Sequence, residues 1–222
     1  MARAPALPFQ SIRAIAFDFD GVILDSVQLK ADLFIEAYDG ELNAVQKEQI
    51  LAYQALHGGV GRVKKFEYFE RAIFGQTPEP TVVAGLAARY GELLMQRIGD
   101  CEELPGARAF LTRFHGRLAL HLVSGTSHDD LVRIVADRSL DLYFDSVTGA
   151  PTGKVEAFST IAENGGWSPH QVLAIGDSST EYVAARELGM PFIGIVKEGD
   201  ANPFPHDLPT YANLQQLDKA SH

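Results

Sequence analysis

The chain is short of cysteine, of tryptophan and of cationic side chains relative to acidic ones. Because Cys101 is the single cysteine, no internal disulfide can form, and nothing in the sequence indicates an oxidising compartment. No apolar run approaches the roughly 20 residues that a membrane-spanning helix needs. The first ten residues also lack the continuous apolar stretch of a secretory signal. We therefore expect a cytoplasmic protein that has no membrane partner.

The charge balance restricts the partners of the protein. Its 222 residues carry 19 Lys and Arg against 29 Asp and Glu, a formal net charge of −10 at pH 7. A chain this acidic has no general attraction to nucleic acid or to an anionic membrane surface. It also repels a phosphorylated substrate, unless a metal ion or a local group of cations reverses the sign. Its 46% hydrophobic and 22% charged residues are typical of a globular protein.

Short apolar runs alternate with segments of helical periodicity over most of the chain. We predict strands at residues 12–17, 118–123, 143–147, 172–175 and 192–196, and helices at 129–137, 155–164 and 180–188. Such alternation favours parallel strands joined by right-handed crossovers. From residue 26 to about 99, apolar residues recur at helical spacing and no strand pattern is seen. The predicted fold is a three-layer α/β core, residues 1–25 and 104–222, with an α-helical cap domain inserted at 26–103.

Polar side chains stand where the predicted strands end. They are Asp18, Asp20, Ser124, Asp177 and, just past its strand at a helix start, Lys154. In a parallel sheet, ligands bind beyond the carboxyl ends of the strands, which all meet at one edge. We therefore expect these residues to converge although they are far apart in the sequence.

The aspartates of this group have the chemistry of a phosphoryl-transfer site. Asp18 with Asp177 can hold a divalent cation through hard oxygen ligands, and the cation removes the repulsion between a carboxylate nucleophile and a phosphoryl group. Asp18 can then take the phosphoryl group as a covalent carboxyl-phosphate. Asp20 can protonate the leaving oxygen and later deprotonate the attacking water.

The remaining polar residues can stabilise the transferring group. The Ser124 hydroxyl and the backbone N–H at Gly125 can donate hydrogen bonds to its oxygens. Lys154 adds positive charge where negative charge gathers. We therefore count Ser124 and Lys154 as candidate catalytic residues and Gly125 as a candidate substrate-binding residue.

Four motifs occur in order along residues 12–196. They are Asp18-Phe-Asp20-Gly-Val-Ile-Leu-Asp-Ser26, Leu122-Val-Ser124-Gly, Gly153-Lys154 and Gly176-Asp177-Ser-Ser-Thr-Glu181. Together they resemble the motifs of the haloacid dehalogenase superfamily, and within it the hydrolases similar to phosphoglycolate phosphatase and β-phosphoglucomutase. The resemblance implies a Rossmann-like core, a helical cap of the C1 type, and Mg²⁺ held by the Asp18 side chain, the Asp20 carbonyl oxygen and Asp177.

Three departures from the superfamily pattern refine this expectation. Haloacid dehalogenases lack an aspartate at the position of Asp20, so its presence favours phosphoryl transfer over dehalogenation. Glu181 stands where the fourth motif usually has a second aspartate, and its longer side chain can orient a metal-bound water without contacting the ion. The third motif lacks the proline that often follows its lysine, here Lys154.

The cap contains one segment suited to binding a substrate. His57-Gly-Gly-Val-Gly-Arg62-Val-Lys64-Lys65 combines three glycines, which allow close backbone approach, with cations at a helix start. Arg62 can hold a second phosphate or a carboxylate through two hydrogen bonds. The segment is similar to the specificity loop of β-phosphoglucomutase. We expect Arg62, Lys65 and, from an earlier helix, Lys30 to contact the substrate.

These observations predict a Mg²⁺-dependent phosphatase, a monomer or a homodimer, that acts on a sugar phosphate or a small acidic organic phosphate. One alternative is a phosphosugar mutase, although mutases of that kind carry a histidine where Lys30 stands. Another is a phosphonatase, which needs a cap lysine that forms a Schiff base, either Lys30 or Lys65. A third is a catalytically silent module that binds an anionic metabolite.

Overall fold

The computed structural model describes residues 11–40 and 42–221, and its centre is a parallel sheet. The strands lie in the order β3-β2-β1-β4-β5-β6. Their bounds are β1 (Ala14–Phe17), β2 (Ala119–Ser127), β3 (Ser146–Ala150), β4 (Val172–Gly176), β5 (Phe192–Ile195) and β6 (Thr210–Tyr211). Phe17 lies opposite Leu122 of β2 and Ile175 of β4, so β1 and β4 end at one edge of the sheet, and β2 continues past that edge to Ser127. This register aligns the residues that follow each strand.

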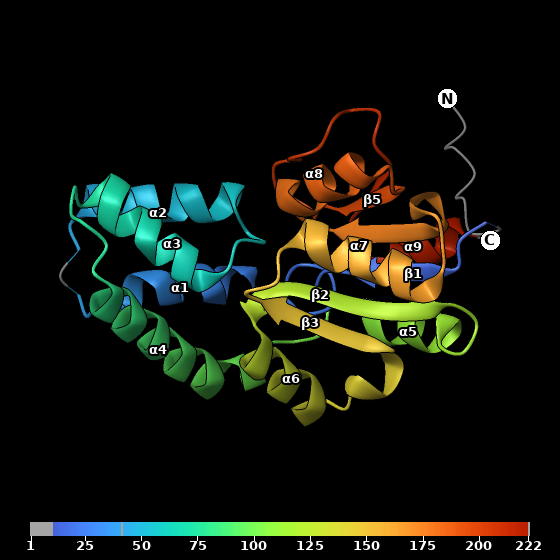
Figure 1. The fold of residues 1–222 in the computed structure, drawn as a ribbon, viewed down its shortest axis with the longest axis horizontal. Coiled ribbons are helices and arrows are strands. Elements are labelled where there is room, and N and C mark those ends of the chain that lie inside the picture. Colours follow the sequence, from blue (N-terminus) through green and yellow to red (C-terminus); the bar gives the residue numbers. More distant parts are fainter. Residues whose placement is uncertain (1–10, 41, 222) are drawn as a thin grey trace.

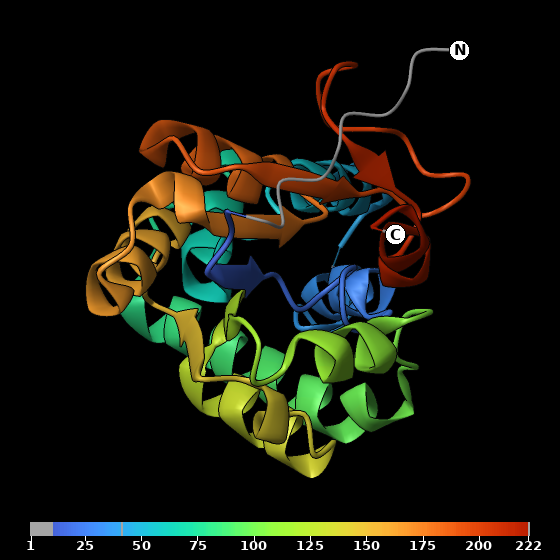
Figure 2. The same cartoon turned by 90° about the vertical axis from the view of Figure 1, so that its right-hand side faces the viewer.

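Helices cover both faces of the sheet, as Figures 1 and 2 show. Ala14 and Ala16 point to one face, where they pack against α7 (Lys154–Gly165) and α8 (Ser179–Leu188). Ile15 and Phe17 alternate to the other face and pack against α5 (Ala107–Phe114), α6 (His128–Asp137) and α9 (Leu214–Ala220). Alternate residues of a strand point to opposite faces, so one short strand supplies both layers of the core. The predicted three-layer α/β fold is confirmed.

Every element between β1 and α5 in the described residues is helical. These elements are α1 (Val27–Glu36), α2 (Ala44–Leu56), α3 (Arg62–Tyr68), a π-helical turn (Phe69–Ile73), α4 (Pro80–Arg97) and a 3₁₀ turn (Ile98–Asp100). They lie beyond the carboxyl ends of the strands in Figure 1. Phe34, Phe66, Phe69 and Tyr90 pack together in their interior, with ring centroids 4.5 to 6.3 Å apart. The apolar cluster continues from these helices into the α/β core, and the domain boundaries at 26 and 103 stay predictions.

The sequence prediction was wrong at one strand and missed three elements. The strand predicted at 143–147 begins at Ser146, because Asp141–Tyr143 forms a 3₁₀ turn instead. Tyr143 and Phe144 are apolar because they pack beside the core, and such packing does not require a strand. Helices α5 and α9 and the two-residue strand β6 were not predicted. None of the helices in residues 11–40 and 42–221 is long and apolar enough to cross a bilayer.

Candidate active site

Asp18 lies directly beyond β1 and is held there by backbone and side-chain contacts. Its N–H donates to the carbonyl oxygen of Ile175, at a distance of 2.8 Å, and it is 5% exposed. Its Oδ1 accepts a hydrogen bond of 2.7 Å from Nζ of Lys154, the first residue of α7. Lys154 Nζ also donates to the Val123 carbonyl oxygen at 2.6 Å and lies 3.0 Å from Oε1 of Glu181. Four segments of the chain therefore meet at this one ammonium.

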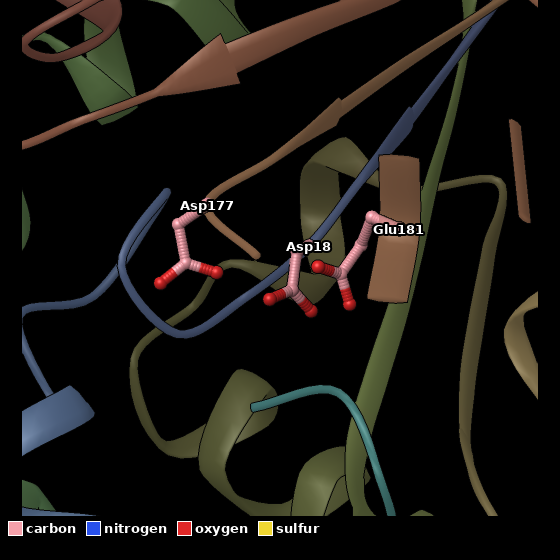
Figure 3. Close-up of side chains that lie close together, drawn as sticks. All are labelled: Asp18, Asp177 and Glu181. Atoms are coloured by element: carbon pink, nitrogen blue, oxygen red, sulfur yellow. The ribbon is translucent and has the colours of Figure 1, made fainter. Parts of the chain in front are cut away.

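Asp18, Asp177 and Glu181 form a cluster of carboxylates, shown in Figure 3. One oxygen from each side chain lies within 4.8 Å of the others. Asp177 follows β4, and a Cβ atom at Gly21, where φ is +73°, would come within 2.2 Å of its Oδ2. The loop after Asp20 therefore packs directly on Asp177. The two aspartates predicted to share an ion do lie close enough to do so.

The donor set of this cluster fits a hard divalent cation. Within the described residues, no hydrogen bond or ion pair reaches the Asp177 carboxylate, whereas Lys154 neutralises part of the charge on Asp18 and Glu181. Glu181 Oε2 accepts hydrogen bonds from the N–H and hydroxyl of Ser178, whereas Oε1 is buried 3.0 Å from Lys154 Nζ and accepts no hydrogen bond in the described part of the chain. Mg²⁺ is bound in proteins by oxygen ligands, among them one or two carboxylates, and this cluster offers such oxygens close together. Glu181 belongs to the same carboxylate cluster as Asp18 and Asp177, so its predicted place behind the metal ligands stays a prediction.

The protonation of these groups reflects their crowding. Burial raises the pKa of Asp18 to about 7, with Lys154 opposing the rise and Glu181 and Asp20 adding to it. Burial and the charge of Asp18 raise the pKa of Asp177 well above its ordinary value. Burial alone would lower the pKa of Lys154, but the two carboxylates beside it raise that pKa, so the ammonium stays charged. A bound divalent cation would stabilise the ionised form of both aspartates.

Asp20, two residues after Asp18, has its own set of donors. Its Oδ1 accepts from the Ser26 hydroxyl at 2.5 Å, and its Oδ2 accepts from Lys30 Nζ at 2.6 Å and from the Ser124 hydroxyl at 3.3 Å. Burial alone would raise the pKa of Asp20, but the Lys30 charge and the hydrogen bonds from Lys30 and Ser26 lower it. Asp20 is therefore ionised in this state.

Arg62, which the sequence predicts to contact the substrate, lines the small pocket and is paired with a carboxylate of the core. Its Nη1 donates to Oδ2 of Asp130 in the first turn of α6, at 2.5 Å, and the Ser127 hydroxyl donates to the same oxygen at 2.7 Å. The guanidinium carbon lies 5.7 Å from the centroid of the Tyr90 ring. A Cβ at Gly91 would come within 2.9 Å of its Nη2. The guanidinium is thus enclosed between the cap helices and the core.

Two connected pockets lie between the cap helices and the core. The larger has a cavity volume of about 240 Å³ and is lined by Asp18, Asp177 and Asp20, among others. The smaller has a cavity volume of about 30 Å³ and lies against Arg62 and Lys65. Both are lined by Asp20, Lys30, Gln54, Gly58 and Gly125. The predicted substrate-binding residues therefore do border a pocket that adjoins the carboxylates.

Sequence reasoning gave no role to four residues that shape the site. Ser26 and Thr126 were within reach of such reasoning, since Ser26 ends the first motif and Thr126 points the same way as Ser124, two residues earlier on β2. Thr126 accepts a hydrogen bond of 2.5 Å from Lys30 Nζ. No sequence signal distinguishes Gln54 or Asp130 from an ordinary helix residue.

Comparison with known proteins agrees with this geometry. Residues 12–189 match the family model described as haloacid dehalogenase-like hydrolase. A phosphoglycolate phosphatase of Synechococcus elongatus is 25% identical over 197 residues, which is 83% of this chain and 84% of that protein. The fold resembles a hydrolase of Pseudomonas syringae, with a TM-score of 0.75, 19% identity and coverage of 95% and 100% of the two chains. It also resembles a magnesium-bound hydrolase of Bacillus subtilis, with a TM-score of 0.66, 19% identity and coverage of 95% and 99%.

The sheet order, the aligned strand ends and the four motifs thus define a hydrolase of the α/β class. The chain belongs to the haloacid dehalogenase-like hydrolase family, whose model matches residues 12–189.

Proposed function

We propose that the chain is a Mg²⁺-dependent phosphatase that hydrolyses a small phosphorylated metabolite through an aspartyl-phosphate on Asp18. The observation that carries the proposal is the arrangement around Asp18. One of its oxygens is bound by Lys154 at 2.7 Å, and the side chain also lies within the carboxylate cluster that includes Asp177. One oxygen is therefore oriented and compensated, which leaves the other for attack on phosphorus.

The residues that would hold Mg²⁺ are the Asp18 side chain, the Asp20 carbonyl oxygen and Asp177. The ion would supply positive charge that screens the substrate phosphate from the carboxylates and stabilises the transferring group. Lys154 supplies a second, permanent charge beside Asp18. Ser124 and Gly125 lie in the second half of β2, and the Ser124 hydroxyl and the Gly125 N–H would donate to phosphoryl oxygens.

Asp20 would transfer a proton both when Asp18 attacks the phosphoryl group and when water hydrolyses the aspartyl-phosphate. Because Lys30 and Ser26 lower its pKa, Asp20 enters the cycle ionised, and the arriving phosphate would raise that pKa by adding negative charge nearby. Asp20 can then take a proton and deliver it to the leaving oxygen when Asp18 attacks. Once the leaving group has departed, the Asp20 carboxylate can deprotonate the water that hydrolyses the aspartyl-phosphate.

The first compound to test is phosphoglycolate, because two of the relatives, from Synechococcus elongatus and Salmonella paratyphi A, are phosphoglycolate phosphatases. Release of inorganic phosphate with Mg²⁺ is measured for the wild type, for Asp18→Asn and for Asp129→Asn, a matched control whose side chain is exposed on α6. We expect Asp18→Asn to lose turnover by about 10³-fold or more, as when a covalent nucleophile is removed. Full turnover by Asp18→Asn would refute the mechanism.

The products of the reaction and its sensitivity to borohydride separate the alternative functions. A phosphosugar mutase would yield an isomerised sugar phosphate and would depend on a bisphosphate activator. A phosphonatase would be inactivated by borohydride in the presence of its substrate, since a Schiff base on Lys30 or Lys65 would be trapped. Free phosphate as the sole product, insensitive to borohydride, supports the phosphatase.

A further inference from the structure

Three cations line the small pocket beyond Asp20, and two of them are already paired with carboxylates. Lys30 Nζ lies 2.6 Å from Asp20 Oδ2, and Arg62 Nη1 lies 2.5 Å from Asp130 Oδ2. Their side chains, and those of their partners, are less than one-fifth exposed. A cation that already has a buried carboxylate partner gains little from binding a second anion. Neither Lys30 nor Arg62 therefore brings uncompensated positive charge to this pocket.

Lys65 differs from the other two cations. It lies in the last turn of α3 and is 2% exposed. Its Nζ donates to Oε1 of Gln54 at 2.5 Å and to the carbonyl oxygen of Gly58 at 3.0 Å, and both of these acceptors are uncharged. Nζ also lies 5.1 Å from the centroid of the Phe34 ring. Within residues 11–40 and 42–221, no carboxylate lies within 4.0 Å of it.

The ammonium of Lys65 can accept a further partner. A lysine ammonium has three N–H donors, and two of those of Lys65 are used by Gln54 and Gly58. A buried charge without a counter-ion is unfavourable in a folded protein. Burial and the nearby charge of Lys30 accordingly lower the pKa of Lys65 to about 7. An anion bound in the pocket would supply the missing counter-charge and the third acceptor.

The position of the pocket indicates which part of a substrate would reach Lys65. The larger pocket contains Asp18 and Asp177, so the phosphoryl group belongs there. Asp20 lines both pockets, and its proposed role is to protonate the leaving oxygen. The leaving group therefore extends from Asp20 into the smaller pocket. With the cap helices placed as they are, that pocket's cavity volume is only about 30 Å³, which suits a small planar group better than a sugar ring.

We propose that Lys65 is the residue that determines substrate specificity, by binding a carboxylate on the leaving group of a small phosphorylated acid. Arg62, the stronger candidate by sequence, instead joins the cap to the core through Asp130. This inference rests on the proposed phosphatase function and assigns its selectivity to one side chain. Asp20 binds Lys30, so the carboxylate of the substrate and the acid/base carboxylate of the enzyme have separate lysine partners.

The test compares two substrates that differ in a single group. 2-Phosphoglycolate carries the carboxylate, whereas 2-hydroxyethyl phosphate has an uncharged hydroxymethyl group in its place. The quantity measured is the ratio of their kcat/KM values, for the wild type and for Lys65→Met. Lys64→Met is the matched control, because Lys64 is the adjacent lysine on the same helix and is exposed. Lys65→Gln serves as a second variant if Lys65→Met does not fold.

We expect the wild type to prefer phosphoglycolate and Lys65→Met to lose that preference by about 10- to 100-fold, the range for removing a charge-assisted hydrogen bond to a buried group. Lys64→Met should keep the wild-type ratio. An equal loss on both substrates would mean that Lys65 is only structural and would overturn the proposal.

The failure of the specificity assignment and the failure of the function can be told apart. A wild type that releases phosphate equally fast from both compounds is a phosphatase, but Lys65 does not select a carboxylate. A wild type that releases phosphate from neither compound, nor from p-nitrophenyl phosphate with Mg²⁺, would overturn the function and the inference together.

Discussion

Replacing Lys65 by methionine should change how the stability of the protein depends on pH. The side chain is 2% exposed, and burial together with the Lys30 charge lowers its pKa from 10.5 to about 7. In the unfolded chain this lysine keeps its ordinary pKa. Between these two values the unfolded state therefore binds more protons than the folded state, and the free energy of unfolding rises with pH. Methionine has a similar length and no titrating group, so that rise should be absent from Lys65→Met.

The size of the effect follows from the same two pKa values. One pKa unit corresponds to about 1.4 kcal/mol. Between pH 7 and pH 9.5 the folded lysine is mostly neutral and the unfolded lysine mostly charged. The wild type should therefore gain about 2 to 3 kcal/mol more than Lys65→Met over this interval. The methionine also leaves Gln54 and the Gly58 carbonyl without a donor, but that cost is similar at both pH values.

The measurement is urea unfolding at pH 7 and pH 9.5, without Mg²⁺ or phosphate, for the wild type, Lys65→Met and Lys64→Met. The charged groups that act on Lys65 are Asp18, Asp20, Lys30 and Glu181, and all of them are present in every variant. Their own titrations therefore largely cancel in the difference. Parallel pH dependence of the wild type and Lys65→Met, at equal m-values, would refute the claim that Lys65 is buried with an altered pKa.

Three further predictions test other parts of the site. Asp130→Asn should lower the free energy of unfolding by about 1 kcal/mol, because the partly buried guanidinium of Arg62 loses its charged partner, and urea unfolding of this variant beside Asp129→Asn measures it. Gly125→Ala should weaken turnover and raise KM, because its Cβ would lie 2.7 Å from the Gly59 carbonyl oxygen and push the cap loop away; unchanged steady-state kinetics would contradict this contact. Mg²⁺ at 100 times its Kd should stabilise the wild type by about 2.7 kcal/mol, and Asp177→Asn should abolish most of that gain in a thermal-unfolding titration, whereas an equal gain in both proteins would place the ion elsewhere.

The convergence of the acidic residues was predictable because it depends on sheet topology. Asp18 and Asp177 each follow an apolar run long enough for one buried strand. Parallel strands of a doubly wound sheet end at a common edge, so the residues after them must be close. The observed register, in which Phe17 lies opposite Ile175, is the detail that brings the two carboxylates within reach of one ion. Lys154 follows the same logic from the first turn of α7.

The pairing of the cap cations was not predictable from local patterns. Arg62 was expected to bind substrate because an arginine follows a glycine-rich loop. Its carboxylate partner, Asp130, lies 68 residues further along the chain, on helix α6 of the α/β core. Only the packing of the cap helices against β2 and α6 brings the two together. Gly91 leaves room for the guanidinium of Arg62, and this role cannot be inferred from the sequence without knowing how the two helices pack.

Lys64 and Lys65 show where the information in the sequence ends. The sequence by itself determined the α/β core, the helical character of the cap and the residues at the strand ends, because these depend on periodicity and chain order. It placed both lysines at one helix start, and the prediction that Lys65 contacts the substrate did not include its burial. Successive residues of a helix point about 100° apart, and Phe66 and Phe69 bury one side of the segment in the aromatic interior of the cap. The rotation of α3 about its own axis, which its packing against the neighbouring helices sets, decides which of the two lysines is buried. Lys65 is enclosed beside the pocket, and Lys64 is exposed to solvent.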